Sequence, residues 1–320
     1  MSTQTLNLTF SAISRIFRAL LQWPFTPRRV SNPKLVMTLL VKNEEEKLER
    51  NLQFHHFMGV DAFIITDNNS TDGTMDIIRR YKQKGWVAEV IEEPSTGYEQ
   101  KQWVDRMIDR ACKCHGADWI INADADEFWY APSGSLKEEL ARCPKRIVRC
   151  LVIGMYPEEE VPFYQWTHRI IPVPAEQREQ YDLSPYSVFN RQTHKVGHRA
   201  SGYLQISMGN HKVKMLPPTS CQSNIIVYHY NIGNREAFMK KMIQGGRELE
   251  QHKGRHGGRH WRYFYQLYKE GRLSEEYDRV VGLNNFSRLK TEGYILEDNT
   301  IRDFFKNNNF SSPHNDAQGL

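Results

Sequence analysis

The sequence predicts an α/β fold, in which a mostly parallel β-sheet is flanked by helices and followed by a helical C-terminal extension. Two observations predict this class. Short apolar runs of strand length alternate with segments in which apolar residues recur every three or four positions. The composition is globular, with 39% hydrophobic and 25% charged residues in a chain of 320. Alternating strands and helices favour right-handed βαβ units, and therefore parallel strands.

Four apolar runs are predicted as the strands of this sheet. The first is apolar along nearly its whole length, which indicates a strand buried on both faces. A fifth predicted strand is RIVRCLVIGMY (146–156), and the run NIIVYHY (224–230) also reads as a strand. The first four are KLVMTLLV (34–41), AFIIT (62–66), WVAEVI (86–91) and DWIINA (118–123).

The segments between these strands are predicted as helices. The first helix follows Asn43, a residue that can cap it. The second contains TMDIIRRY (74–81) and ends near Gly85, and the third lies between Tyr98 and His115. From about residue 234 onward the chain again reads as helical, in the stretches REAFMKKMIQ (235–244), RYFYQLYKEG (262–271) and EEYDRVV (275–281).

This pattern divides the chain into three parts. Residues 1–32 form an amphipathic N-terminal segment, residues 33–233 form the α/β domain, and residues 234–320 form a helical region that ends in a disordered tail. Within the first part, the apolar residues of 6–25 recur at helical spacing with two arginines between them. Two alternatives stay open, an interfacial helix at a membrane surface and a helix packed on its own domain. The residues concerned are Phe10, Ile13, Phe17, Leu20, Leu21, Arg15 and Arg18.

The charge of the chain favours an anionic partner. The formal net charge is +5, which fits a nucleotide, a nucleic acid or a membrane surface. Much of the basic density lies in HKGRHGGRHWR (252–262), which is either a lid over a diphosphate or an exposed linker.

The cysteine count and the lack of targeting segments predict a cytoplasmic protein. Five cysteines are an odd number, and we interpret them as reduced thiols. The segment CKCH (112–115) lacks a second Cys/His pair at a suitable distance, so we interpret it as a helix end and not as half of a zinc site. No stretch approaches the ~20 apolar residues that cross a bilayer. Contact with the inner face of the membrane through residues 6–25 is the alternative that this location leaves open.

Polar side chains follow three of the predicted strands. Asn43 and Glu44 come after the first strand, and Asp67 and Asn68 after the second. Asp124 and Asp126 come after the fourth. Ligands of open α/β sheets bind outside the carboxyl ends of the strands, so we expect these three clusters to meet at one edge.

The acidic motif INADADEFWY (121–130) predicts a divalent cation at that edge. In extended backbone, Asp124 and Asp126 point to the same side and can face one ligand. Two carboxylates without a cation would repel each other, whereas Mg²⁺ and Mn²⁺ prefer such hard oxygen ligands. We expect Glu127 and Phe128 to support the loop and not to bind the metal.

Taken together, these motifs resemble the nucleotide-sugar-binding half of family 2 type glycosyltransferases with the GT-A fold, in a sub-group with a D-x-D-E-F motif. The similarity lies in LVKNEEEKLERNLQFHHFMGVDAFIITDNNSTDGT (40–74) and INADADEFW (121–129). A weaker similarity continues in KVGHRASG (195–202), GNHKV (209–213) and VYHYNIGNREAFMKKMIQGG (227–246). The resemblance implies that residues 33–233 form a GT-A domain.

The resemblance also implies roles for the matching residues. Asp124 would lie near the ribose and the metal, and Asp126 would be the principal ligand of Mn²⁺ or Mg²⁺. Asn68 stands where many members have a second Asp, which leaves the identity of the base open. The residues that would line the base and ribose pocket are Asn43, Glu44, Asp67 and Asn68.

The reaction that this resemblance implies is displacement at the anomeric carbon of a nucleotide-activated sugar by an acceptor hydroxyl. His229, at the end of an apolar run, is the candidate third metal ligand, and His211 competes with it. An inverting enzyme needs a carboxylate to take the acceptor's proton. The candidate bases are Glu158 and Glu159 in PEEE (157–160), and a solvated acidic loop is the alternative for them.

We therefore expect a metal-dependent, hexosyltransferase-like enzyme in surface polysaccharide or glycoconjugate synthesis. Its partners would be a nucleotide-sugar donor and a glycan or lipid-linked acceptor, with no nucleic acid. Two other classes stay open. A phosphohydrolase or nucleotidyltransferase would use the same acidic pair, and a nucleic-acid-binding module would use the aromatic side chains of 252–268, such as Trp261, Tyr263 and Phe264.

Overall fold

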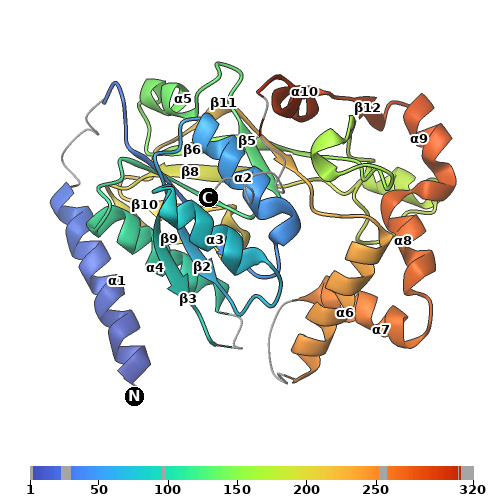
Figure 1. The fold of residues 1–320 in the computed structure, drawn as a ribbon, viewed down its shortest axis with the longest axis horizontal. Coiled ribbons are helices and arrows are strands. Elements are labelled where there is room, and N and C mark those ends of the chain that lie inside the picture. Colours follow the sequence, from blue (N-terminus) through green and yellow to red (C-terminus); the bar gives the residue numbers. More distant parts are fainter. Residues whose placement is uncertain (1–2, 23–29, 96–98, 252–257, 309, 311–320) are drawn as a thin grey trace, which may run out of the picture. The chain divides into compact units, whose positions relative to one another are not determined.

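The computed structural model describes residues 3–22, 30–95, 99–251, 258–308 and 310. The chain forms two compact units, which are described separately below (Figure 1). Unit 1 comprises Met1–Val152, Thr193–Val227 and Ser312–Leu320, and unit 2 comprises Ile153–Gln192 and Tyr228–Ser311. Most of the basic segment 252–262 and of the C-terminal tail lies outside the described residues, as do the side chain of Phe10 and residues 23–25.

An eight-stranded sheet with the order β3-β2-β1-β4-β8-β6-β11-β5 forms the frame of unit 1. Its first four strands are parallel, and β8 then pairs antiparallel with both β4 and β6. The strands are β1 (Leu35–Val41), β2 (Ala62–Asp67), β3 (Val87–Glu92), β4 (Trp119–Ala123), β5 (Glu127–Tyr130), β6 (Ile147–Gly154), β8 (Lys195–Arg199) and β11 (Ser220–His229), and a separate hairpin pairs β9 (Tyr203–Ile206) with β10 (Val213–Met215).

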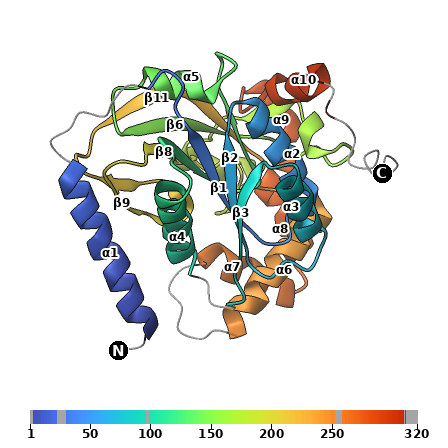
Figure 2. The ribbon, with the colours of Figure 1, turned by 60° about the vertical axis from the view of Figure 1, so that its left-hand side comes forward.

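Helices cover both faces of the parallel strands (Figure 2). Alternate residues of β1 point to opposite faces, and those on one face, such as Val36, pack with Met107 and Ile108 of α4. Because both faces are covered, β1 and β2 are buried almost throughout, as their apolar composition predicts. The helices of this unit are α1 (Thr3–Gln22), α2 (Glu45–Phe57), α3 (Thr74–Gln83), α4 (Gln100–Lys113), α5 (Leu136–Arg142) and the short η3 (Met208–Asn210).

Unit 2 is mainly helical around its own apolar core. Phe238 of α6, Phe264 of α7 and Tyr277 of α8 meet in this core. Its elements are α6 (Arg235–Gln251), α7 (Arg259–Lys269), α8 (Leu273–Val281), α9 (Phe286–Thr291), α10 (Thr300–Asn307), the strand pair β7 (His168–Ile170) and β12 (Ile295–Glu297), and the short helices η1 (Phe163–Gln165), η2 (Ala175–Tyr181) and η4 (Leu283–Asn285).

The predicted elements are confirmed, and the α/β class with them. The four predicted parallel strands form β1 to β4, the two later runs form β6 and β11, and the predicted helices form α2, α3, α4, α6, α7 and α8. The compact units divide the chain differently from the predicted boundary at residue 233. Unit 2 also contains residues 153–192, because the chain leaves unit 1 near the end of β6 and returns before β8.

The N-terminal segment forms a helix, and the cysteines are reduced. Residues 3–22 form one helix, and among the described residues no helix has the length and apolar character to span a bilayer. All five cysteines are free thiols. Cys112 and Cys114 lie at the end of α4, where His115 pairs with Glu89 at 2.8 Å, as expected of a helix end.

Candidate active site

The three predicted polar clusters meet at one edge of the sheet. In the parallel register, Val41 lies across from Asp67 and Leu39 lies across from Ala123, so β1, β2 and β4 all end at this edge. The residues that follow the three strands therefore leave the sheet side by side. We refer to this region, formed by residues 42–45, 67–74 and 124–127, as the acidic edge.

The first two clusters of the acidic edge are tied to each other by hydrogen bonds. Asn43 has a positive φ of 55°, and its side-chain Oδ1 accepts from the backbone N–H of Thr71 at 2.8 Å. The backbone N–H of Asn43 donates to the hydroxyl of Ser70 at 2.9 Å. The predicted cap of α2 by Asn43 is thus wrong, because the cap position is held by Glu44 and the Asn43 side chain spans to the neighbouring loop.

Asp67 and Asn68 take different roles at the end of β2. Asp67 is buried, and its Oδ2 accepts from the backbone N–H of Ser70 at 3.1 Å. Its Oδ1 has no hydrogen-bond partner among the described residues. The side-chain amide of Asn68 instead donates to the backbone carbonyls of Glu93 at 3.0 Å and Ser95 at 2.8 Å. Asp67 therefore offers a buried acceptor, whereas the Asn68 amide holds the loop after β3.

The acidic motif after β4 is organised around a lysine that sequence reasoning missed. The Nζ of Lys195 lies 3.2 Å from Asp124 Oδ2 and 2.5 Å from Glu127 Oε1. Glu127 is fully buried and also accepts from the indole N–H of Trp129 at 3.4 Å, while Asp124 is partly open to solvent. Glu127 therefore supports the loop, as predicted, and Asp126 beside it is buried.

The antiparallel register of β8 explains how Lys195 reaches this motif. Ile121 of β4 lies across from Gly197 of β8, and two further steps place Lys195 across from Ala123, immediately before Asp124. Burial lowers the pKa of Lys195, but the charges of Glu127 and Asp124 outweigh it and raise this pKa above its usual value. The ammonium is therefore a fixed positive charge inside the motif.

Two side chains of helix α2 also hold the acidic motif, through hydrogen bonds to its backbone. The Asn51 amide donates to the backbone carbonyls of Ala125 at 3.0 Å and Glu127 at 2.9 Å. Nε2 of His55 accepts from the backbone N–H of Trp129 at 3.0 Å, so His55 is neutral and protonated on Nδ1, which donates to the carbonyl of Asn51. Its burial lowers its pKa to about 3. These two residues were not predicted, because only the fold reveals that α2 faces the motif.

The side-chain oxygens at this edge fit in part the ligands of a hard divalent cation. Asp124 and Asp126 supply carboxylate oxygens, the type of ligand that Mg²⁺ and Mn²⁺ prefer. Among the described residues, however, no group of three His, Cys, Asp or Glu side chains is placed to hold a metal. Mg²⁺ is commonly held by one or two carboxylates, with waters and substrate phosphates completing the shell, and two carboxylates match that pattern.

Of the two candidate histidines, His211 belongs to unit 1 and His229 to unit 2. His211 is hydrogen-bonded to Thr193 and to the carbonyl of His194. Burial and the charge of Lys195 lower its pKa, while the charge of Asp124 acts in the opposite direction, so His211 is within electrostatic reach of the acidic edge. His229 ends β11, and its backbone carbonyl accepts from Met155 at 3.0 Å. Its role as a metal ligand stays a prediction.

The predicted catalytic carboxylates both lie in unit 2. Oε1 of Glu158 accepts from the backbone N–H of Thr167 at 2.6 Å and from its hydroxyl at 2.9 Å, and His168 Nδ1 lies 3.0 Å away. These contacts give Glu158 a structural task within its own unit. Glu159 is exposed. Burial is the main cause that raises the pKa of Tyr277, and the negative charge of Glu159 raises it further.

The aromatic residues that suggested nucleic-acid binding pack inside unit 2. Phe264 is buried, Tyr263 donates to Glu276 at 2.8 Å, and Trp261 covers Gly245 of α6. A base-stacking platform needs exposed rings. The side chains on which the nucleic-acid alternative depends are thus engaged in the core and its margin.

The sequence of this chain matches a known protein family. The sequence model of a family described as Glycosyl transferase family 2 matches residues 39–201, just over half of the chain, a range that includes the acidic edge and Lys195. No curated protein matches the chain.

Similar solved structures include TarS of S. aureus (its residues 1–349), with a TM-score of 0.35, 15% identity and coverage of 82% of this chain and 74% of that one. The mannosyltransferase PcManGT of Pyrobaculum calidifontis, solved with GDP-Man and Mn²⁺, has a TM-score of 0.37 and 12% identity, covering 90% and 85%. Glucosyl-3-phosphoglycerate synthase of Mycobacterium tuberculosis has a TM-score of 0.27 and 17% identity, covering 38% and 44%.

Proposed function

Because the chain belongs to glycosyl transferase family 2, and is therefore a glycosyltransferase with the GT-A fold, we propose that it moves a sugar from a nucleotide-diphosphate donor to an acceptor hydroxyl. The observation that carries this proposal is the acidic edge. There, a buried Asp67 whose Oδ1 has no partner in the described part of the chain ends β2, and Asp124 and Asp126 follow β4 at the same edge. The acceptor we propose is a glycan or a lipid-linked glycan of a surface polysaccharide or glycoconjugate.

Each residue of the acidic edge has a distinct task in this proposal. The free Oδ1 of Asp67 accepts a hydrogen bond from the base or the ribose of the donor, since a buried acceptor without a partner otherwise costs stability. Asn43 holds the loop that carries Ser70 and Thr71, and so shapes the same pocket. Asn68 acts through the backbone that it fixes.

Asp124 and Asp126 would hold Mn²⁺ or Mg²⁺ together with the donor's diphosphate. When bound, the cation would supply positive charge that offsets the negative charge developing on the leaving diphosphate. Lys195 fixes Asp124 and Glu127 in place and leaves fewer negative charges for the cation to neutralise. Asn51 and His55 hold the backbone of the motif, so the carboxylates are positioned before the donor arrives.

The base that takes the acceptor's proton remains a separate proposal. Of the two candidates, Glu159 fits this task better, because it is exposed and hydrogen-bonds only Tyr277 among the contacts described above, while one oxygen of Glu158 is held by both Thr167 and His168. Replacing Glu159 by Gln while donor binding is retained would separate proton transfer from donor recognition.

Asp126→Asn tests the proposal. Nucleotide sugars of each base are screened with Mn²⁺ for thermal stabilisation and for sugar transfer, since a ligand that binds the native state raises its stability. We expect the substitution to lower turnover on the order of 10²–10³-fold and to remove the Mn²⁺-dependent stabilisation, because the loss falls on electrostatic stabilisation of the leaving group.

The matched control is Asp76→Asn on α3, an equivalent change at a side chain that is 79% exposed. It should leave both readouts unchanged. Melting of Asp126→Asn without ligand shows whether the fold is intact. Full transfer by this variant in the presence of a chelator would contradict the proposal, and so would a wild-type protein that releases free phosphate and transfers no sugar.

A further inference from the structure

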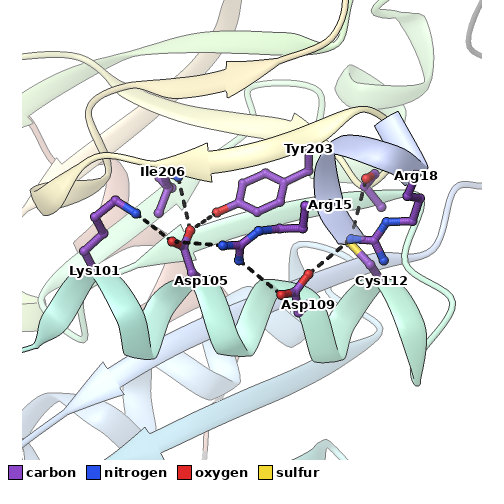
Figure 3. Close-up of polar contacts among 9 residues, drawn as sticks. Arg15, Arg18, Lys101, Asp105, Asp109, Cys112, Tyr203 and Ile206 are labelled. Carbon is purple, nitrogen blue, oxygen red and sulfur yellow. Dashed lines mark hydrogen bonds and ion pairs between the residues drawn. The ribbon is translucent and has the colours of Figure 1, made fainter. Parts of the chain in front are cut away.

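Helix α1 is attached to unit 1 through its polar side (Figure 3). Arg15 places its Nη1 at 3.1 Å from Asp109 and its Nη2 at 3.8 Å from Asp105, both on α4. Arg18 approaches Asp109 at 3.1 Å. The side chain of Arg15 is only 9% exposed, so this ion pair is shielded from solvent. The helix is therefore held by charges and not by an apolar stripe.

The α4 carboxylates that hold α1 are themselves fixed by other contacts. Asp105 also forms an ion pair with the Nζ of Lys101 at 2.7 Å. It accepts hydrogen bonds from the hydroxyl of Tyr203 and from the backbone N–H of Ile206, the latter at 3.3 Å. At the end of α1, Gln22 accepts from the backbone N–H of Gly202 at 2.9 Å. Contacts from α4 and from the β9 region thus fix the helix between Arg15 and Gln22, and fix which side of this part faces outward.

The outward side of α1 is apolar. Its members recur at i, i+3, i+4, i+7 and i+8, which is one continuous helical stripe. Phe17 and Leu21 are the most exposed of them, at 65% and 63%. A surface helix usually buries such a stripe and exposes its charges, and here the arrangement is reversed. The stripe consists of Ile13, Ile16, Phe17, Leu20 and Leu21.

The sequence around this helix carries the positive charge of the chain. Residues 1–34 contain no Asp or Glu, and the 38 basic and 38 acidic residues of the rest cancel. Arg15 and Arg18 pair with α4, and the sequence places further basic residues shortly after the helix with no acidic residue among them. The five basic residues of this segment are Arg15, Arg18, Arg28, Arg29 and Lys34.

We infer that α1 is a membrane-binding helix that inserts its apolar stripe into the interface of an anionic lipid bilayer, while Asp105 and Asp109 hold its other side to unit 1. Interfacial binding requires two elements. Large apolar residues insert into the bilayer, and nearby basic residues attract its anionic headgroups. A second copy of the chain fits the stripe less well, since the shared interface would bring two basic segments together. This inference goes beyond sugar transfer and does not depend on it.

Co-sedimentation of the full chain with vesicles tests this inference. One set of vesicles is phosphatidylcholine alone, and the other contains phosphatidylglycerol as well. The wild type should sediment with the anionic vesicles and much less with the neutral ones, and added salt should weaken the binding. The variant Phe17→Gln/Leu21→Gln should bind about tenfold or more weakly, because it removes inserted apolar surface and keeps both arginines.

The control Phe57→Gln makes the same change at an exposed phenylalanine at the end of α2, and should bind the anionic vesicles like the wild type. Thermal melting confirms that each variant is folded. Wild-type protein that ignores both kinds of vesicle would overturn the inference, as would unchanged binding by the Phe17/Leu21 variant. A dimer in sedimentation velocity that this variant dissociates would also overturn it, by assigning the stripe to a second copy.

Discussion

At the scale of single residues, the positive charge of Lys195 offsets part of the negative charge of the acidic motif. Its ammonium is buried between Asp124 and the fully buried Glu127. A carboxylate enclosed in this way is costly unless a partner remains beside it. The motif is thus partly compensated by the protein before any cation binds.

Removing that compensation has a measurable cost. Lys195→Met should lower the free energy of unfolding by roughly 3–5 kcal/mol, because the buried charge of Glu127 then loses the opposite charge beside it. Urea denaturation measures the loss. The double variant Lys195→Met/Glu127→Gln should recover part of it, and a double variant as unstable as the sum of the two single changes would show that the pair is not coupled.

The residues of the candidate site differ in how far their position could be predicted from the sequence. Asp67, Asp124 and Asp126 were predictable because each follows an apolar run whose end can be read directly from the sequence. Lys195, Asn51 and His55 were not, since their contacts with the motif depend on the register of β8 and on which side of α2 faces the loop. Those are tertiary properties that no local pattern records.

At the scale of elements, the pair Gly245 and Gly246 explains how α6 and α7 pack. A Cβ added to Gly245 would lie 2.0 Å from the Trp261 ring, and one on Gly246 would lie 2.3 Å from Tyr265. Two aromatic side chains of α7 therefore rest directly on the backbone of α6. The glycines inside a helix, which normally weaken it, are required by this close approach.

This packing gives a prediction whose sign is informative. Gly245→Ala should destabilise unit 2 by about 1–3 kcal/mol through overpacking against Trp261. Helix propensity alone would make the same change stabilising by up to about 1 kcal/mol. Thermal unfolding distinguishes the two outcomes. Gly154→Ala serves as the control, because its new Cβ would meet only ordinary contacts, the nearest at 3.5 Å.

The strands show the same division between local and tertiary information. Strands β1, β2 and β4 are buried almost throughout, and their apolar composition makes them recognisable in the sequence. Strands β5 and β8 were not predicted, since EFWY is short and KVGHR is mostly polar. Their pairing in the sheet, and not their composition, makes them strands.

At the scale of the whole molecule, two buried histidines link stability to pH. Burial lowers the pKa of His55 to about 3 and that of His198 to about 4. Both are neutral in the folded protein, whereas the unfolded chain binds a proton on each below about pH 6.5. Their contribution to stability is therefore complete above pH 6.5 and is lost as the pH falls toward the folded values.

The effect can be isolated with one variant. Between pH 7 and pH 5, each histidine should lower the free energy of unfolding by about 2 kcal/mol. His198→Gln removes one of these sites, so its loss over the same interval should be smaller than that of the wild type by about that amount. Urea unfolding at both pH values measures the difference, and equal losses would contradict the assignment of neutral His198 in the folded state.

The way the backbone threads the two units limits how the protein can be dissected. Unit 2 is assembled from two stretches of chain, Ile153–Gln192 and Tyr228–Ser311, with Thr193–Val227 of unit 1 between them. A stop codon between residues 153 and 228 deletes only part of unit 2, and one before residue 193 also removes Thr193–Val227, which belongs to unit 1. Isolating either unit as a stable fragment therefore requires excising an internal stretch and rejoining its ends with a designed linker.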